Sequence, residues 1–275
     1  MRAVCDLCPR FCSIAEGDRG KCQVRYNNGG KVASSAYGLL TALALDPIEK
    51  KPLAEFQPGG MVLSAGSYGC NMSCAFCQNW HISASNGTDV KLISCSPDEL
   101  VREAVSLRKN GNIGLAYTYN EPLVNYEYVY DCAKLARAEG LKNVLVTNGM
   151  INGAKFSELI EYFDAANIDL KSFSADFYLS FGGNLDCVKS NICIAAGKIH
   201  LEITTLVIEG INDSKDELDA ECRWISDIND EIPLHLSRFF PHYKMRDRSP
   251  TSKSKMYELK AVAEKYLKKV YLGNM

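Results

Sequence analysis

Residues 69–80 read GCNMSCAFCQNW, and this stretch decides how the rest of the chain is interpreted. Cys70, Cys74 and Cys77 stand in the spacing C-x3-C-x2-C, which places three thiolates in one compact loop. Four thiolates normally saturate an iron–sulfur cube, so three leave one iron open to a substrate or cofactor. A zinc site would need a fourth ligand, for which His81 is the nearest candidate, and a disulfide would need an oxidising compartment. The spacing therefore favours an iron–sulfur cluster with one open iron.

Composition sets broad limits on the kind of protein. The chain has 275 residues, 47% of them hydrophobic, and 31 Lys and Arg against 33 Asp and Glu, a net charge of −2. Nothing in this balance indicates a nucleic-acid or membrane surface. The first residues lack the apolar run of a signal peptide, and no apolar stretch is long enough to span a bilayer. With 12 cysteines in such a chain, we expect a cytoplasmic protein with metal or redox chemistry.

Short apolar runs alternate with helical patterns from about residue 60 onward. This alternation is typical of parallel strands joined by helices. The predicted strands are 61–65, 113–118, 143–147, 166–170, 201–208 and 234–240, and the predicted helices are 97–109, 121–139, 155–163, 185–196, 214–229 and 255–268. We therefore predict an α/β fold, an open, partial parallel (β/α)6 barrel behind a small cysteine-rich segment. We expect residues 1–58 to form that segment and residues 59–275 to form the barrel.

Polar residues gather where the predicted strands end, which is where barrels of this kind carry their chemistry. Asp169 and Lys171 alternate with apolar neighbours, so both point to one face, as ligand-binding groups or as a structural ion pair. Glu121 is either a ligand-binding acid or a first-turn helix acid. We also expect side chains of the fifth strand to face the lumen. The further candidates are Phe76, Asn120, Thr147, Asn148 and His242, and on the fifth strand Glu202, Thr204 and Thr205.

Four more cysteines lie near the amino terminus. Cys5, Cys8, Cys12 and Cys22 are separated by two, three and nine residues. Four thiolates at such spacing can form a tetrahedral zinc site or hold another iron–sulfur cluster. The alternatives are that only some are ligands or that the segment folds without metal. We favour a metal here, zinc or iron–sulfur.

The cysteine spacing and the residues at the strand ends resemble the radical S-adenosylmethionine (SAM) superfamily. The likeness extends to the radical SAM component of the AmmeMemoRadiSam system, on the amino-terminal Cys-x2-Cys-Pro run, residues 46–53 (DPIEKKPL) and the run Phe240-Pro241-His242-Tyr243. It also includes pyruvate formate-lyase activating enzymes, which share the Asp169-Leu170-Lys171 run. Where relatives carry Gly-Gly-Glu, this chain has Tyr119-Asn120-Glu121.

The resemblance implies a [4Fe–4S] cluster on Cys70, Cys74 and Cys77 that cleaves SAM to a 5′-deoxyadenosyl radical. That radical abstracts hydrogen from a protein or other substrate, and a flavodoxin or ferredoxin supplies electrons. The resemblance places Glu121 at the SAM amino group and Lys171 at its carboxylate. Asn120, Asp169, Thr147, Asn148, Phe76 and His242 are further expected contacts. The alternative is a non-catalytic iron–sulfur or zinc protein for electron transfer or protein interaction.

Overall fold

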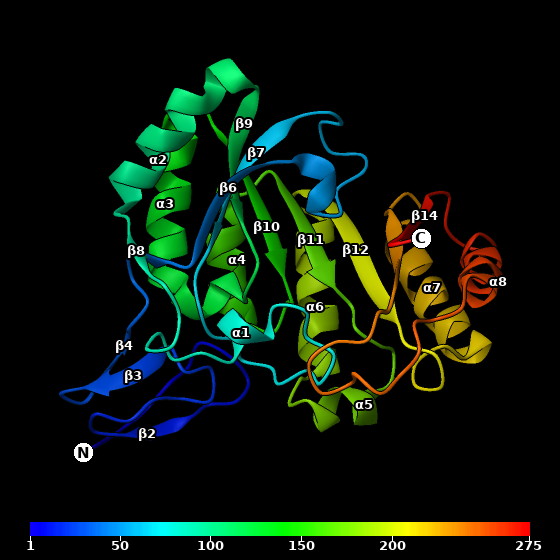
Figure 1. Cartoon of the computed structure of the whole chain (residues 1–275), viewed down its shortest axis with the longest axis horizontal. Coiled ribbons are helices and arrows are strands. Elements are labelled where there is room, and N and C mark those ends of the chain that lie inside the picture. Colours follow the sequence, from blue (N-terminus) through cyan, green and yellow to red (C-terminus); the bar gives the residue numbers. More distant parts are fainter.

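The computed structural model describes residues 1–275 and is built on one eight-stranded sheet. The strand order is β14-β13-β12-β11-β10-β9-β7-β6 (Figure 1). All neighbours run parallel except β6, which is antiparallel to β7. The strands are β6 (Ala42–Pro47), β7 (Met61–Gly66), β9 (Asn112–Tyr117), β10 (Lys142–Thr147), β11 (Ala165–Asp169), β12 (His200–Val207), β13 (Leu234–Arg238) and β14 (Val270–Gly273). This open sheet confirms the predicted fold class and adds two edge strands, β6 and β14.

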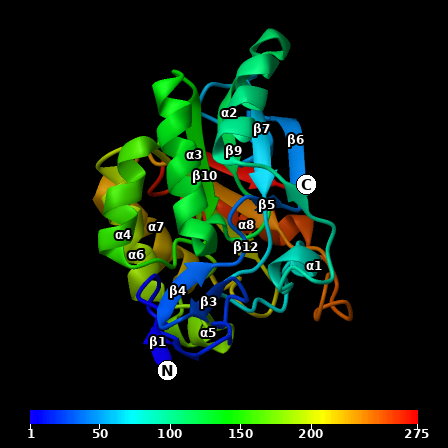
Figure 2. The same cartoon turned by 90° about the vertical axis from the view of Figure 1, so that its left-hand side faces the viewer.

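Helices between the strands cover the outer face of the sheet, as Figures 1 and 2 show. The main ones are α2 (Pro97–Ser106), α3 (Tyr126–Ala138), α4 (Gly153–Leu159), α6 (Leu185–Ala196), α7 (Lys215–Asn229) and α8 (Lys253–Ala263). Ser96 and Glu99 form a capping box at the start of α2. The predicted helix 121–139 begins instead as the 3-10 turn η3 (Pro122–Asn125) and becomes α-helical at Tyr126. Shorter helices are η1 (Ile48–Lys50), α1 (Trp80–Ser83), η2 (Leu107–Asn110), η4 (Ile160–Tyr162) and α5 (Ala175–Ser180).

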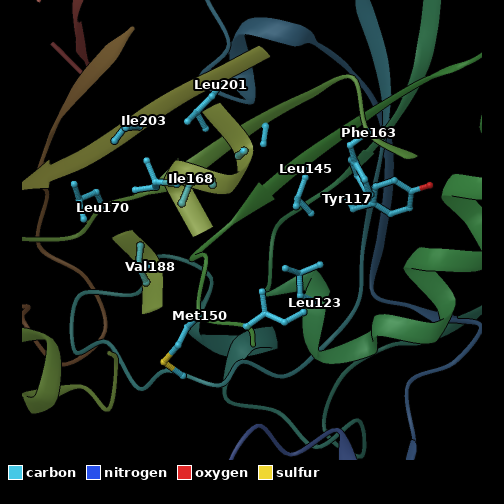
Figure 3. Packing of buried hydrophobic residues seen from close by; sticks show 14 of the residues in the cluster. Tyr117, Leu123, Leu145, Met150, Phe163, Ile168, Leu170, Val188, Leu201 and Ile203 are labelled. Carbon is cyan, nitrogen blue, oxygen red and sulfur yellow. The ribbon is translucent and has the colours of Figure 1, made fainter. Parts of the chain in front are cut away.

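The hydrophobic core lies between the sheet and these helices. Leu145, Ile168 and Ile203 point from neighbouring strands into it, and Val188 of α6 meets them (Figure 3). Because side chains alternate along a strand, the residues between these apolar ones point into the barrel lumen. The sheet therefore separates an apolar outer face from a lumen that can hold polar groups.

The segment 48–56 fills the lumen at the amino-terminal end of the strands. Ile48 and Leu53 pack there in a small apolar cluster with strand residues. The buried carboxylate of Glu202 accepts hydrogen bonds from the backbone of Ala54 and Glu55, at 2.9 and 2.8 Å. His235 also pairs with this carboxylate. This end of the lumen is therefore filled by the chain itself, and the cavity lies at the opposite, carboxyl-terminal end of the strands.

The amino-terminal segment contains short paired strands beside the carboxyl ends of the barrel strands (Figure 1). β1 (Arg2–Val4) pairs with β2 (Ser13–Ala15), β3 (Arg25–Asn28) with β4 (Lys31–Ser34), and β5 (Leu39–Leu40) with β8 (Ile93–Ser94). β6 lies before the predicted boundary at residue 58 yet pairs with β7 of the barrel. The division into residues 1–58 and 59–275 stays a prediction. None of the helices is long and apolar enough to cross a membrane.

Candidate active site

The carboxyl ends of the parallel strands surround a cavity of about 330 Å³. Residues from β10, β11, β12 and β13, from the segment 118–121 that follows β9, and from the cysteine loop (residues 69–80) line it. The predicted site residues in the lining are Cys70, Cys74, Phe76, Cys77, Asn120, Glu121, Thr147, Asn148, Asp169 and Lys171. The structure thus brings together nearly all the side chains that the sequence analysis selected at this end of the barrel. Their contacts with a cofactor stay predictions.

The loop cysteines (Cys70, Cys74 and Cys77) are the donor set of this cavity, whose lining has no fourth cysteine and no histidine. Burial raises the pKa of the Cys70 thiol well above its ordinary value and that of Cys74 to about 11. The backbone N–H of Met72 and the Asn148 side chain donate to the Cys70 sulfur, at 3.4 and 3.6 Å. Thiols of this kind ionise when a metal binds them. Three thiols beside a cavity fit a cluster that keeps one iron open better than they fit a closed zinc site.

Asn120 braces the cysteine loop from the end of β9. Its amide nitrogen donates to the carbonyls of Tyr68 and Gly69, at 2.9 and 3.0 Å, and its oxygen accepts from the Ser67 backbone. These bonds engage the side chain with the loop that carries the cysteines. Asn120 is therefore placed to position that loop, and a direct contact with SAM stays a prediction.

Tyr119 adopts a backbone φ of 73°, in the left-handed region that favours glycine. It is therefore a non-glycine residue in a conformation that is costly for a side chain with a Cβ. Asn79 of the cysteine loop donates to the Tyr119 carbonyl at 2.7 Å, and the Tyr119 hydroxyl donates to Asp46 at the same distance. These contacts offset the cost of the strained backbone, which is about 1–3 kcal/mol.

Glu121 ties together the ends of β9 and β10. Its buried carboxylate accepts from the Thr147 hydroxyl at 2.7 Å and from the backbone N–H groups of Asn148 and Leu123, at 2.8 and 3.0 Å. Burial raises its pKa to about 7, although these hydrogen bonds act in the opposite direction. Glu121 caps η3, as the helix-acid interpretation expects, and it also lines the cavity. A carboxylate has about four acceptor positions, so one remains for a ligand.

Asp169 and Lys171 form an ion pair at the end of β11, with 2.8 Å between Nζ and Oδ2. Burial alone would lower the pKa of Lys171, but the Asp169 carboxylate and the Cys74 sulfur hold it above its ordinary value. Both side chains line the cavity, so the pair faces the lumen as predicted. Lys171 thus brings a fixed positive charge next to a loop cysteine.

Side chains of the fifth strand divide between the two faces of the sheet. Thr204 lines the cavity, and its hydroxyl is buried without a protein partner. An unpaired buried hydroxyl in a cavity wall fits a site that receives a polar ligand. Thr205 was predicted to face the lumen, and this prediction is wrong: its hydroxyl bonds to Glu221 of α7. Alternation along β12 explains the difference, since neighbouring residues point to opposite faces.

Sequence reasoning missed Lys51, a buried lysine in the wall of the cavity. Lys51 is 3% exposed and donates to Asp46 at 2.8 Å, and the Tyr119 ring lies 4.8 Å from its ammonium. Burial raises the pKa of Asp46, but Lys51 and Tyr119 outweigh it and lower the pKa overall. Lys50 and Lys51 line the cavity. The run DPIEKKPL, two adjacent lysines between prolines, was the available signal, but it had been used only for the family resemblance.

Phe76 and His242 have different surroundings. Phe76 lines the cavity and packs against Phe177 and Phe181, with ring centres 6.2 and 5.8 Å apart. His242 is outside the cavity lining, and a contact with SAM stays a prediction. Its loop lies against the cysteine loop, because the backbone of Lys244 donates to the Ala75 carbonyl at 3.0 Å.

The amino-terminal cysteines (Cys5, Cys8, Cys12 and Cys22) come together at a second, smaller cavity. All four line this cavity, which lies behind the cysteine loop because Asn71 also contributes to its wall. The remaining cysteines are dispersed, and Cys193 is exposed on α6. The chain therefore carries two separate groups of cysteines, one at the barrel mouth and one beside it.

Comparisons with known proteins agree with this geometry. Residues 65–222 match the family described as the radical SAM superfamily. An uncharacterized protein of Methanocaldococcus jannaschii is 41% identical over 276 residues, which cover 98% of this chain and 81% of that protein. Pyruvate formate-lyase 1-activating enzyme of Escherichia coli strain K12 is 23% identical over 74% of this chain and 88% of that enzyme.

Solved structures show the same fold. A domain of pyruvate-formate lyase-activating enzyme from Bacteroides vulgatus matches with a TM-score of 0.51 and 21% identity, covering 58% of this chain and 99% of that domain. Methylornithine synthase matches with a TM-score of 0.52 and 15% identity over 78% of this chain and 66% of that protein. Members of the matched family use a [4Fe–4S] cluster and SAM, for which this cavity has the donor set. The family match and the alignment over nearly the whole chain together show that this protein belongs to the radical SAM superfamily.

Proposed function

We propose that the protein is a radical SAM oxidoreductase of the activating-enzyme type, which removes a hydrogen atom from a protein or other substrate. The observation that carries this proposal is one cavity that combines the loop cysteines with Glu121, Asp169 and Lys171. The similarity to pyruvate formate-lyase activating enzymes supports the reaction class. The large share of this chain and of those enzymes that aligns supports it further.

The loop cysteines would hold the cluster at the mouth of the barrel. When bound and reduced, a [4Fe–4S] cluster supplies the electron that splits SAM into methionine and a 5′-deoxyadenosyl radical, which takes a hydrogen atom from the substrate. The protein's task is to hold these partners in place and to keep water away from them. The bonds from Met72 and Asn148 to the Cys70 sulfur fix one cluster ligand and place donors beside it.

Two charged groups are suited to the two charges of the methionyl part of SAM. Lys171, held by Asp169, would bind the carboxylate, and Glu121 would accept from the ammonium with its remaining acceptor position. Both groups are already fixed by contacts within the protein, so little side-chain entropy is lost when SAM binds. This arrangement would orient SAM with its sulfonium towards the loop cysteines.

The remaining predicted contacts would place the nucleoside. Phe76 would offer an aromatic face to the adenine, and Thr147 and Asn148, which line the cavity, would contact ribose or methionyl oxygens. Asn120 would act mainly through the cysteine loop that it braces. His242, which lies outside the cavity lining in the loop that contacts the cysteine loop, would contact SAM or substrate at the edge of the cavity.

The proposed partners are a flavodoxin or ferredoxin and a substrate that reaches the barrel mouth. Lys244, Arg246 and Arg248 are exposed in the loop that contacts the cysteine loop. A basic surface of this kind favours encounter with an acidic electron carrier or an acidic protein segment. Because this loop contacts the cysteine loop at Ala75, a partner bound to it would lie beside the proposed cluster site.

An anaerobic assay tests the proposal. The protein is reconstituted with iron and sulfide, reduced with dithionite and given SAM, and 5′-deoxyadenosine and methionine are measured. We expect equal amounts of both products from the wild type and none from Cys74→Ala. A reducible four-iron cluster that binds SAM but gives no products, with or without a flavodoxin, would favour a non-catalytic protein. Failure to bind a four-iron cluster would overturn the proposal.

A further inference from the structure

We propose that the amino-terminal cysteines bind a single zinc ion. We also propose that the segment which carries them, residues 5–22 (the zinc segment), supports the cysteine loop of the active site. All four thiols line one small cavity, although they come from different turns of the chain. This proposal does not rest on the proposed function, because it concerns a separate group of ligands. Zinc is favoured by four thiolates in tetrahedral arrangement, with sulfur about 2.3 Å from the metal.

The size of the cavity favours one ion over a second cluster. Its volume is about 20 Å³, close to the space that a single water molecule needs. A four-iron cluster would have to place four irons and four sulfides in the same space. The active-site cavity, at about 330 Å³, is far larger. The two groups of cysteines therefore suit different inorganic partners.

A buried donor without a partner provides a second, independent observation. Arg25 is 7% exposed and lines the cavity, and its terminal nitrogens pair with Glu127. Its Nε–H is buried with no hydrogen-bond partner. Such a group normally has an acceptor, and metal-bound thiolates are negatively charged acceptors. A zinc–thiolate centre would supply that acceptor.

A backbone N–H group is also directed at one of the sulfurs. The N–H of Arg25 donates to the Cys22 sulfur at 3.4 Å. A donor of this kind stabilises a thiolate and helps to orient it as a ligand.

The zinc segment is packed directly against the cysteine loop. Arg10 donates to the carbonyl of Asn71 at 2.6 Å, and the Asn71 side chain accepts from Asn148 at 2.9 Å. Gly69 passes so close that an added Cβ would lie 2.4 Å from the Cys22 carbonyl oxygen. The residue before the first loop cysteine and the residue after it thus both rest on this segment. Zinc binding that fixes the zinc segment would therefore also fix the backbone of the cysteine loop at Gly69 and Asn71.

In the structure, no three cysteine, histidine or acidic side chains lie close enough together to hold a metal ion. Binding must accordingly pull the four sulfurs inward. We expect zinc to rigidify the segment and, through Arg10 and Gly69, the cysteine loop.

The experiment separates this site from the cluster. The variant Cys70→Ala/Cys74→Ala/Cys77→Ala removes the cluster ligands from the full chain, and its zinc, iron and sulfide are measured. We expect about one zinc per chain and no iron. A matched pair, Cys8→Ser and Cys193→Ser, is made in the same background. The first should lose the zinc and the second, an exposed cysteine on α6, should keep it.

Cobalt provides a readout that does not depend on the Cys8→Ser variant folding. The metal-free triple variant is titrated with Co²⁺, and we expect thiolate-to-cobalt charge-transfer bands and the visible bands of a tetrahedral ion at one equivalent. Zinc should then displace cobalt. Iron and sulfide in the triple variant would overturn the proposal in favour of a second cluster. Absence of both zinc and the tetrahedral cobalt spectrum would overturn it in favour of a metal-free segment.

Discussion

The two groups of cysteines differ in what surrounds them. The loop cysteines are three in number and face a wide cavity that also contains Glu121, Asp169 and Lys171. The amino-terminal cysteines are four in number and face a small cavity whose charged side chains are the two arginines Arg10 and Arg25. An incomplete ligand set in a roomy, charged cavity suits the binding of a reacting molecule, whereas a complete set in a tight one suits structural support. The number of thiols and the space beside them together indicate which role each group has.

The largest effect should come from removing one loop cysteine. In Cys70→Ala we expect loss of the four-iron absorbance and of 5′-deoxyadenosine formation to background, because only three thiols serve this site. Zinc content should stay unchanged if the two groups are independent in their metals. Metal analysis alongside the nucleoside assay checks both points. If the Cys70→Ala variant kept its cluster iron, the loop cysteines would not be the cluster ligands, and the contrast between the two groups of cysteines would be wrong.

The contact between the two groups is tested at Gly69. In Gly69→Ala, the φ of 81° and the Cβ contact of 2.4 Å with the Cys22 carbonyl should destabilise the fold by about 3 kcal/mol. Gly59→Ala is the matched control, since Gly59 has the same φ and nothing within 4 Å of the added Cβ. Strain alone should cost about 1 kcal/mol there. Denaturant unfolding of both variants measures the difference, and equal losses would show that the close approach does not matter.

Charge in the large cavity is tested at Lys171. We expect Lys171→Met to weaken SAM binding by about 10- to 100-fold, because a hydrogen bond to a charged group contributes about 1.5–3 kcal/mol. The cluster should remain intact. Lys134→Met, on an exposed face of α3, is the control. Isothermal titration with SAM on the reconstituted proteins provides the measurement, and unchanged affinity would remove Lys171 from the proposed site.

The central strands were predictable because their apolar runs are buried on the outer face, as at Ile168 and Ile203. β14 was missed because it is a four-residue edge strand. β6 was missed because it ends in Asp46 and Pro47, which are typical of loops. Along β12, strict alternation of side chains predicts which residues face the lumen and which face the helices. The expectation that both Thr204 and Thr205 face the lumen did not follow this alternation.

The candidate site was predictable where position along a strand decides the outcome, as for Asp169 and Lys171. The ion pair of Lys51 with Asp46 was not, because adjacent charged residues normally indicate exposure. Lys51 is buried only because residues 48–56 enter the lumen, and that is a property of the tertiary structure. For the same reason, the closeness of the amino-terminal cysteines to the cysteine loop could not be read from spacing.

The smallest expected effect concerns pH at Glu121, whose pKa burial raises to about 7. The unfolded value is about 4.3, so the folded state favours the protonated form. This contribution to stability is fully present below about pH 4.3 and is lost as pH rises through 7. SAM binding should have the opposite slope, because only the ionised carboxylate attracts the SAM ammonium. We expect the affinity to fall about tenfold for each unit below pH 7.

Glu221 makes the matched control, because burial raises its pKa to about 8 while it lies on α7, outside the cavity. Glu221→Gln should change the pH dependence of stability and leave that of SAM binding intact. Glu121→Gln should flatten the pH dependence of binding. Titrations with SAM between pH 6 and 8 compare the two variants, with the cluster absorbance recorded at each pH. If both keep the wild-type slope, the proposed contact of Glu121 with the ammonium is wrong, and its carboxylate serves only to join the ends of β9 and β10. The charge selectivity of the large cavity would then come from Asp169, Lys171 and the lysines of residues 50–51.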